Sequence, residues 1–175
     1  MVETATDVRN ISRIAFSTYE QNPVANLNPD AGGRPVCETD PIVRDIGFAN
    51  ATRLVIWEIK EYWAIGIRGT VLSCKDNVAT DLYFSQEQLH ECLWRDSEQG
   101  KERPHVHAGF QEAYVKARPE IRTELSRIGL VRWNDDQDSG GNFQADKPII
   151  VTGHSLGGAL AVLLALDLTL NSKRR

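Results

Sequence analysis

One stretch of the sequence has the residue types and spacing of a reactive serine. Gly153-His-Ser-Leu-Gly157 follows a short apolar run that begins after Pro148, and it leads into a second apolar run that reaches Leu166. A strand that turns sharply into a helix makes a serine hydroxyl project from the backbone, where it can attack the carbonyl carbon of an ester. The pattern therefore predicts a nucleophile elbow with Ser155 as the nucleophile.

The small residues around Ser155 meet the steric demands of such a turn. The turn leaves almost no room for side chains two positions before and after the serine, where the sequence has Gly153 and Gly157. Gly158 and Ala159 allow the helix to start close to the strand. The amides at a helix N-terminus carry partial positive charge, which stabilises an oxyanion. A buried strand followed by a helix that is apolar on all sides is typical of the centre of an α/β sheet.

The other chemically active side chains form no comparable pattern. His105 and His107 alternate as they would on one face of a strand, but the sequence offers no third metal ligand near them. His154 precedes the serine and is expected to face away from it. The three cysteines lack Cys-x-x-Cys spacing, which favours reduced thiols over a disulfide framework or a zinc site. We expect neither a metal site nor a cofactor.

The elements that position the elbow can be predicted from the spacing of apolar residues. Residues 5–19 have apolar side chains three or four positions apart, which predicts an amphipathic helix. Prolines and glycines are dense over residues 21–52, which predicts a surface loop. Residues 53–59 and 63–67 are rich in Val, Ile and Trp and predict two strands of a tight antiparallel hairpin.

A second amphipathic helix is predicted between the hairpin and the elbow. Residues 110–128 repeat apolar side chains at steps of three and four. Pro119 lies within this range, and proline removes a backbone donor and collides with the preceding turn. We therefore expect either a kinked helix or a short helix followed by a longer one.

Composition limits the class of protein. The chain of 175 residues is 41% hydrophobic and 25% charged, which fits one domain over residues 1–175. The net charge of −4 comes from well-mixed acidic and basic residues, so no basic face is available for nucleic acid. No apolar stretch of signal-peptide length lies near the N-terminus, and glycines interrupt the one long uncharged run, 149–166. We expect a cytoplasmic protein without a transmembrane segment.

Two further motifs precede the elbow. The first is Ala64-Ile-Gly-Ile-Arg-Gly-Thr70, followed by Thr80-Asp-Leu82, and the second is Val106-His-Ala-Gly-Phe110. In order and spacing, these motifs and the elbow resemble the class 3 lipase family, the fungal-type lipases and their esterase relatives within the α/β-hydrolase superfamily. The resemblance implies a partial α/β-hydrolase fold, with a mixed, mostly parallel sheet, flanking helices and no C-terminal part of the sheet.

The resemblance also implies roles for individual positions. Ser155 corresponds to the nucleophile, and the backbone N–H of Leu156 to one donor of the oxyanion hole. Thr70 resembles the second donor, through its backbone N–H and its hydroxyl. Asp81 matches an acidic position that steadies the loop of that donor. Each donor aimed at the developing negative charge contributes about 3 kcal/mol to transition-state stabilisation.

The segment after Thr70 departs from the family pattern. In these lipases it forms a lid helix, which here would cover residues 72–79, but this segment is polar and lacks a large aromatic side chain. A lid that docks on lipid presents an apolar face. A short-chain or more soluble ester therefore remains open beside triacylglycerol, as does peripheral contact with a lipid surface.

The catalytic triad of the family is incomplete in this sequence. α/β-Hydrolases place the triad in the order nucleophile, acid, histidine, but the 20 residues after Ser155 contain no histidine. The lone later carboxylate, Asp167, is twelve positions away, about 18 Å along a helix, and cannot orient a base at the serine. We expect a chain truncated after the nucleophile helix.

Three functions remain open from the sequence. The first is a lipase or carboxylesterase whose acid and histidine lie in downstream sequence or in a partner chain. The second is a catalytically inactive lipase-like fragment that binds acyl lipid or a protein partner. The third is an acyltransferase, in which an alcohol rather than water accepts the acyl group from the serine.

Overall fold

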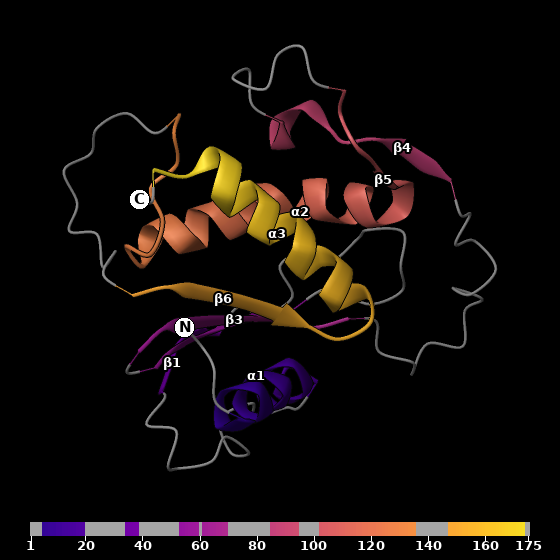
Figure 1. Ribbon diagram of the computed structural model, residues 1–175. Coiled ribbons are helices and arrows are strands. Elements are labelled where there is room, and N and C mark those ends of the chain that lie inside the picture. The colour runs from indigo at the N-terminus through magenta and orange to yellow at the C-terminus, as the bar shows by residue number, and fades with distance from the viewer. Residues whose placement is uncertain are drawn as a thin grey trace.

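A mixed sheet with helices on both faces forms the centre of the molecule (Figure 1). The structure is a computed structural model, and it describes residues 5–19, 34–38, 53–59, 61–69, 85–94, 102–135 and 147–173. Helix α1 (Ala5–Ser17) lies on one face of the sheet, whereas α2 (Ala108–Arg127) and α3 (Leu156–Asn171) cover the other face. Both helices predicted upstream of the elbow are therefore confirmed.

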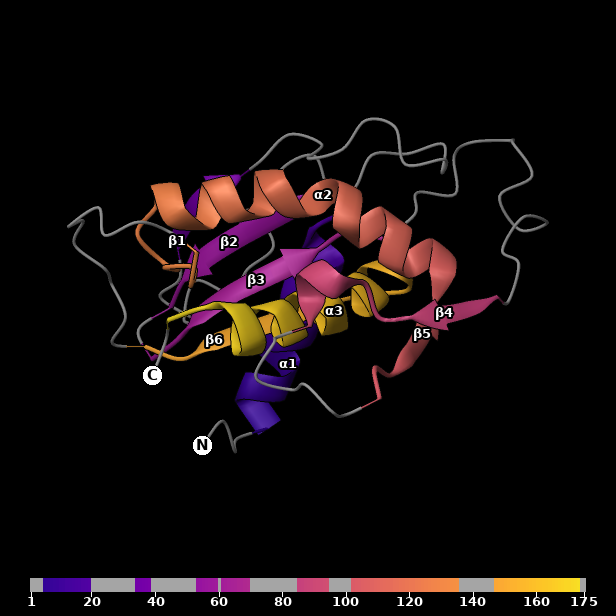
Figure 2. The ribbon, with the colours of Figure 1, turned by 90° about the horizontal axis from the view of Figure 1, so that it is seen from above.

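Four strands lie side by side in the order β1-β2-β3-β6 (Figure 2). They are β1 (Arg34–Glu38), β2 (Leu54–Glu58), β3 (Trp63–Ile67) and β6 (Ile149–Gly153). The β1–β2 and β2–β3 pairs are antiparallel, which confirms the predicted hairpin, and β3 pairs with β6 in parallel. The fold class is confirmed as mixed α/β, but parallel pairing is not the majority among the described strands, because the hairpin and β1 make up most of them.

Strand β1 corrects the prediction of a surface loop over residues 21–52. Its residues pair with β2, and the register shifts between Pro35 and Cys37. A proline cannot donate to a strand ladder and is tolerated mainly in edge strands, which is the position of β1 in the described sheet. The density of turn-forming residues was misleading because an edge strand accommodates proline at little cost.

Both faces of the sheet are buried, which explains the uninterrupted apolar runs of its central strands. Leu54, Ile56 and Ile65 face α2 and α3, and they belong to the larger core. Val55 and Trp57, on the opposite face, pack with Ile14 of α1 in a smaller core. The two cores hold β3 and β6 between layers of helix, so the end of β6 is a rigid place from which to project a side chain.

Helix α2 continues through Pro119, and the alternative of two separate helices is wrong. One apolar stripe runs along its whole length, with Tyr114, Ala117 and Ile121 among its buried residues. Burial of this stripe on the core outweighs the single backbone hydrogen bond that proline removes. No described helix is both long enough and apolar enough to span a membrane.

A small two-stranded sheet precedes α2. Strand β4 (Gln86–Gln88) pairs antiparallel with β5 (His105–His107), and a short 3₁₀ helix, η2 (Glu91–Leu93), follows β4. Strand β4 was not predicted from the sequence, because all three of its residues are exposed and carry no apolar alternation. Leu89 and Leu93 are fully buried and attach the region to the larger core.

Candidate active site

Ser155 lies at the joint between β6 and α3, in a backbone conformation that serine seldom adopts. Its φ is 56° and its ψ is −128°, and it is the one non-glycine residue with positive φ in the described ranges. The residue is exposed, and its side chain does not cap the helix that it precedes. Positive φ in a non-glycine residue is strained and persists only where the surrounding structure imposes it. The geometry is that of a nucleophile elbow, with the serine side chain directed away from the core.

Two glycines make this turn possible, as the sequence predicted. A Cβ atom on Gly153 would lie 2.2 Å from the carbonyl oxygen of Gly157. A Cβ atom on Gly157 would lie 2.1 Å from the carbonyl oxygen of Ile67, at the end of β3. The start of α3 thus packs directly on the backbone of two neighbouring strands. Any side chain at either position would push the helix away from the sheet and open the elbow.

The amides that follow Ser155 form the first turn of α3. The N–H of Gly157 donates to the carbonyl of His154 at 3.0 Å, and the N–H of Gly158 donates to the carbonyl of Ser155 at 2.9 Å. Leu156 is the first residue of the helix, so its N–H belongs to the group of amides that have no acceptor within the helix. Backbone donors at such a helix start are suited to an oxyanion.

Two of the four residues predicted for the site lie outside the described residues. They are Thr70 and Asp81, and the segment at residues 72–79 that corresponds to the family's lid is also outside. The described part of the first motif ends at Gly69, which lies next to the elbow. The structure therefore brings Ser155, Leu156 and Gly69 together, and the second oxyanion donor stays a sequence prediction.

Three of the four histidines, His90, His107 and His154, have local contacts of their own. His154 packs its ring against Phe16 and Tyr19, which lie at the end of α1 and just after it. His107 accepts a hydrogen bond from the N–H of Phe110 at 3.4 Å and so caps α2, and His90 caps η2 in the same way. Among the described residues, no three His, Cys, Asp or Glu side chains are grouped to hold a metal ion.

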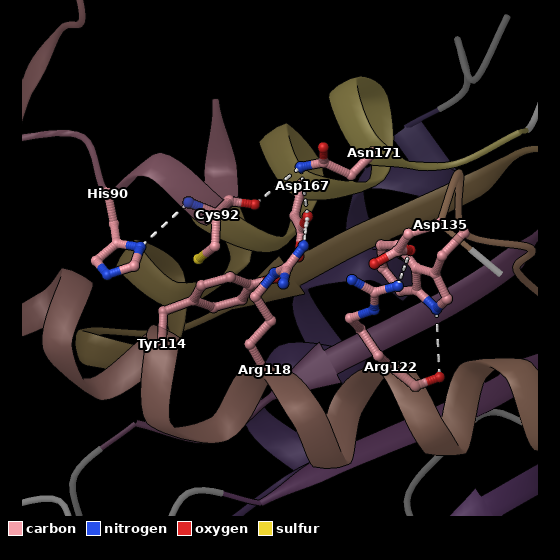
Figure 3. Close-up of polar contacts among 9 residues, drawn as sticks. His90, Cys92, Tyr114, Arg118, Arg122, Asp135, Asp167 and Asn171 are labelled. Carbon is pink, nitrogen blue, oxygen red and sulfur yellow. Dashed lines mark hydrogen bonds and ion pairs between the residues drawn. The ribbon is translucent and has the colours of Figure 1, made fainter. Parts of the chain in front are cut away.

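The C-terminal end of α3 carries a buried carboxylate, Asp167, whose partners were not predicted from the sequence. Asp167 is fully buried and lies opposite α2 (Figure 3). Arg118 donates to both of its oxygens, at 2.7 and 3.0 Å, and the Tyr114 hydroxyl donates at 2.9 Å. Asn171 donates to it at 2.8 Å and also reaches the carbonyl of Cys92 at 3.3 Å. We call these residues the Asp167 network.

The Asp167 network ties the two helices above the sheet to each other and to the small sheet region. Burial raises the pKa of the Tyr114 hydroxyl well above its ordinary value, and the nearby negative charge of Asp167 adds to this effect. Burial likewise raises the pKa of the Cys92 thiol. The carboxylate of Asp167 has its acceptor capacity filled by these donors, so its role is to fix α3 rather than to orient a base.

Comparison with known proteins places this geometry in a family. Residues 64–175 match the family described as Lipase (class 3). Over 74 residues the chain is 40% identical to phospholipase A1-Igamma2, chloroplastic, of Arabidopsis thaliana, an alignment covering 36% of this chain and 13% of that protein.

Solved lipases share the fold. The lipase of Rhizopus microsporus var. chinensis superposes with a TM-score of 0.55 at 22% identity, over 97% of this chain and 53% of that one. The Rhizomucor miehei lipase in its propeptide complex gives a TM-score of 0.53 at 19% identity, over 97% of this chain and 48% of that one. The chain thus spans about half the length of these lipases. Since the family match extends over more than half of its residues, the chain belongs to the class 3 lipase family of the α/β-hydrolase superfamily.

Proposed function

We propose that this chain supplies the nucleophile and part of the oxyanion hole of a serine hydrolase that cleaves carboxylic esters of lipids. The observation that carries the proposal is the conformation of Ser155, exposed and at positive φ between β6 and α3. A strained backbone at one residue, held by two cores, is typical of a position under functional constraint. Membership of the class 3 lipase family supports the same chemistry.

The proposed reaction follows the two steps of covalent serine catalysis. The Ser155 oxygen attacks the ester carbonyl and passes its proton to a base, and the carbonyl oxygen becomes an oxyanion. The N–H groups of Leu156 and Thr70 donate to that oxyanion, and Asp81 steadies the loop that carries Thr70. As the intermediate collapses, the base returns the proton to the leaving oxygen, which departs as the alcohol and leaves an acyl-serine. Water then hydrolyses the acyl-serine to the free acid and restores the Ser155 hydroxyl.

Ser155, Leu156, Thr70 and Asp81 do not include the base that accepts the proton of Ser155. No histidine follows Ser155 in the sequence, and His154 is engaged with the aromatic residues beside α1. Asp167 is buried in its own network at the other end of α3. The proposed reaction therefore needs a base other than these residues, and an added small-molecule base should supply it in part.

A lipid ester is the substrate class that the surroundings of Ser155 favour. Phe16 is 58% exposed, and its ring lies tilted against that of His154 with centroids 5.0 Å apart, so an apolar ring lies beside the elbow. An exposed aromatic at this place suits an acyl chain or the surface of a lipid aggregate. The phospholipase A1 and the two lipases named above point to the same class of substrate.

The experiment measures the reactivity of Ser155 in the purified chain with imidazole as the base. The wild type is incubated with a fluorophosphonate probe and, separately, with p-nitrophenyl butyrate, beside Ser155→Ala and the matched control Ser126→Ala on α2. We expect a covalent adduct at Ser155 by peptide mass spectrometry, and turnover above the imidazole background, in the wild type and in Ser126→Ala alone.

The alternative is a lipase-like protein that binds acyl lipid without cleaving it. A folded wild-type chain with no adduct at Ser155 at any imidazole concentration would contradict the proposal and favour this alternative. If turnover occurs, glycerol as a competing acceptor separates hydrolysis from acyl transfer through the ratio of free acid to glyceryl ester.

A further inference from the structure

The hydroxyl of Tyr19 joins two backbone segments that meet at the elbow. The N–H of Gly69, two residues beyond β3, donates to Tyr19 Oη at 3.1 Å. The hydroxyl in turn donates to the carbonyl oxygen of His154 at 3.3 Å, and Nδ1 of His154 lies 3.4 Å from it. One side chain from just after α1 therefore contacts both the residue before Ser155 and the end of the first family motif.

The contact occurs where the two segments approach as closely as their backbones allow. A Cβ atom on Gly69 would lie 2.5 Å from the carbonyl oxygen of His154 and 2.6 Å from Tyr19 Oη. The nitrogen of Gly69 is also within 2.8 Å of the place where a Cβ of Gly157 would stand. The space around the Tyr19 hydroxyl is thus determined on each side by backbone atoms.

Helix α1 holds Tyr19 in this place. Thr18 is fully buried and donates its hydroxyl to the carbonyl of Ala15 at 2.8 Å, and the N–H of Tyr19 donates to the carbonyl of Phe16 at 3.1 Å. The ring of Tyr19 meets the ring of His154 edge-on, with centroids 6.0 Å apart. The packing of α1 on the sheet therefore holds Tyr19 in place, and its hydroxyl and ring contact the elbow through His154.

We propose that Tyr19 is a positioning residue for the reaction of Ser155. Its hydroxyl fixes the distance between the Gly69 backbone and the elbow, and with it the start of the peptide that carries the second oxyanion donor of the proposed reaction. Donors stabilise an oxyanion only within about 2.7–3.1 Å, and small misplacements of the reacting groups lower rates steeply. Gly69 also supplies the carbonyl half of the peptide whose N–H belongs to Thr70. The inference rests on the proposed function.

The test compares two Tyr→Phe variants. Tyr19→Phe removes the hydroxyl at the elbow, whereas Tyr114→Phe removes a buried hydroxyl from the Asp167 network at the other end of α3. Both variants are first checked for folding by circular dichroism and thermal unfolding. The fluorophosphonate labelling of Ser155 in imidazole buffer is then resolved into its maximal rate and its half-saturating probe concentration.

We expect Tyr19→Phe to lower the maximal labelling rate about tenfold, with the half-saturating concentration unchanged within about twofold. Tyr114→Phe should unfold at lower temperature but label at the wild-type rate, because Arg118 and Asn171 still bind Asp167 and keep α3 in place. Amide hydrogen exchange at Gly69, which does not depend on reactivity, should become faster in Tyr19→Phe only.

The outcomes separate this inference from the proposed function. The role of Tyr19 would be overturned if Tyr19→Phe labelled at the wild-type rate, or if amide exchange at Gly69 were the same in Tyr19→Phe as in the wild type. Either result would leave Ser155 as a nucleophile. A wild-type chain that never labels overturns the proposed function, and with it the role of Tyr19 in that reaction. Equal slowing in both variants would also overturn the inference, because it would show a general effect of stability.

Discussion

The two ends of helix α3 are built in opposite ways. Its N-terminal end carries an exposed serine at positive φ, flanked by glycines and packed on bare backbone. Its C-terminal end carries a buried carboxylate, Asp167, whose oxygens accept from Arg118, Tyr114 and Asn171. One end holds a strained serine in solvent, and the other end satisfies a buried charge.

The contrast shows how a strained residue can be held in a small domain. A strained backbone costs about 1–3 kcal/mol and tends to relax unless the surrounding structure prevents it. Relaxation at the elbow would require α3 to move along or away from the sheet. The Asp167 network ties α3 to α2, and α2 in turn lies on the larger core, so this movement is resisted from the other end.

The largest effect should come from adding a methyl group at the elbow. In Gly157→Ala the new Cβ would lie 2.1 Å from the Ile67 carbonyl oxygen and 2.8 Å from the Gly69 nitrogen, both of them backbone atoms that cannot turn aside. We expect a loss of about 5 kcal/mol in the free energy of unfolding, or no folded protein, measured by urea denaturation.

The matched control is the next glycine along α3. In Gly158→Ala the nearest atom to the new Cβ is the Gly153 carbonyl oxygen at 3.2 Å, and alanine favours the helix by about 0.5–1 kcal/mol. This variant should fold with stability near that of the wild type. Equal losses in both variants would show that the elbow is no more restricted than the rest of the helix start.

The second effect comes from the opposite end of α3. Asp167→Asn keeps the size of the side chain, but it removes the charge that Arg118 requires and points an N–H₂ group at donors. Breaking a buried ion pair in this way costs about 3 kcal/mol, again measured by urea denaturation. Glu112→Gln, which removes an exposed partner of Lys116, is the control and should change stability by less than about 0.5 kcal/mol.

The sequence alone predicted one end of α3 far better than the other. At the elbow, the glycines and the serine are local signals, because the turn that they allow lies within five residues. The Asp167 network joins residues about fifty positions apart, and spacing along one helix gives no information on such a partner. A single aspartate in an otherwise apolar helix was still a signal, since a buried charge must be paired.

The same distinction explains the other outcomes. Strands β2 and β3 were predicted because burial on both faces leaves a plain apolar run, whereas β1 and β4 lie at edges and carry proline or exposed polar residues. The role of Tyr19 could not be predicted, because its contacts depend on where α1 lies on the sheet. The sequence thus predicted those features whose causes are local.

The third prediction concerns high pH and follows from the raised pKa of Tyr114, caused first by burial and then by Asp167. Unfolded tyrosine ionises near pH 10, whereas Tyr114 in the folded state stays protonated there. The folded state then binds more protons than the unfolded state, so the stability contributed by Tyr114 is present below about pH 10 and is lost as pH rises, by about 1.4 kcal/mol per unit.

The measurement is the free energy of unfolding of the wild type and Tyr114→Phe at pH 9, 10 and 11. At pH 9 the variant should be less stable by about 1 kcal/mol, because Asp167 loses one donor. The gap should close and then reverse as pH rises. If the free energy of unfolding changed with pH in the same way in the wild type and in Tyr114→Phe, Tyr114 would have the same pKa in the folded and unfolded states. That result would mean that this part of the network is open to water.

The smallest effect on stability is expected at the ion pair between Arg122 and Asp135. Like the Asp167 network, it joins an arginine of α2 to an aspartate, but its aspartate is exposed. Arg122, one turn further along α2 than Arg118, donates to Asp135, whose side chain is 69% exposed. The hydrogen bond from Arg122 lowers the pKa of Asp135, so the pair stabilises the fold above the ordinary carboxyl pKa and loses this effect as pH falls through the lowered value.

Because water screens this pair, Asp135→Asn should cost less than about 1 kcal/mol at pH 7, and the cost should shrink further in 1 M salt. Arg122 keeps a second contact in the variant, since its guanidinium lies 4.6 Å from the ring centroid of Trp133. Urea denaturation of the wild type and Asp135→Asn at pH 7 and pH 3, at low and high salt, measures both the pH dependence and the salt dependence of the stability that the pair contributes. Asp135→Asn could instead lower the free energy of unfolding as much as Asp167→Asn does, whatever the salt concentration. That result would show that the difference in burial between the two aspartates does not decide how much their ion pairs contribute to stability.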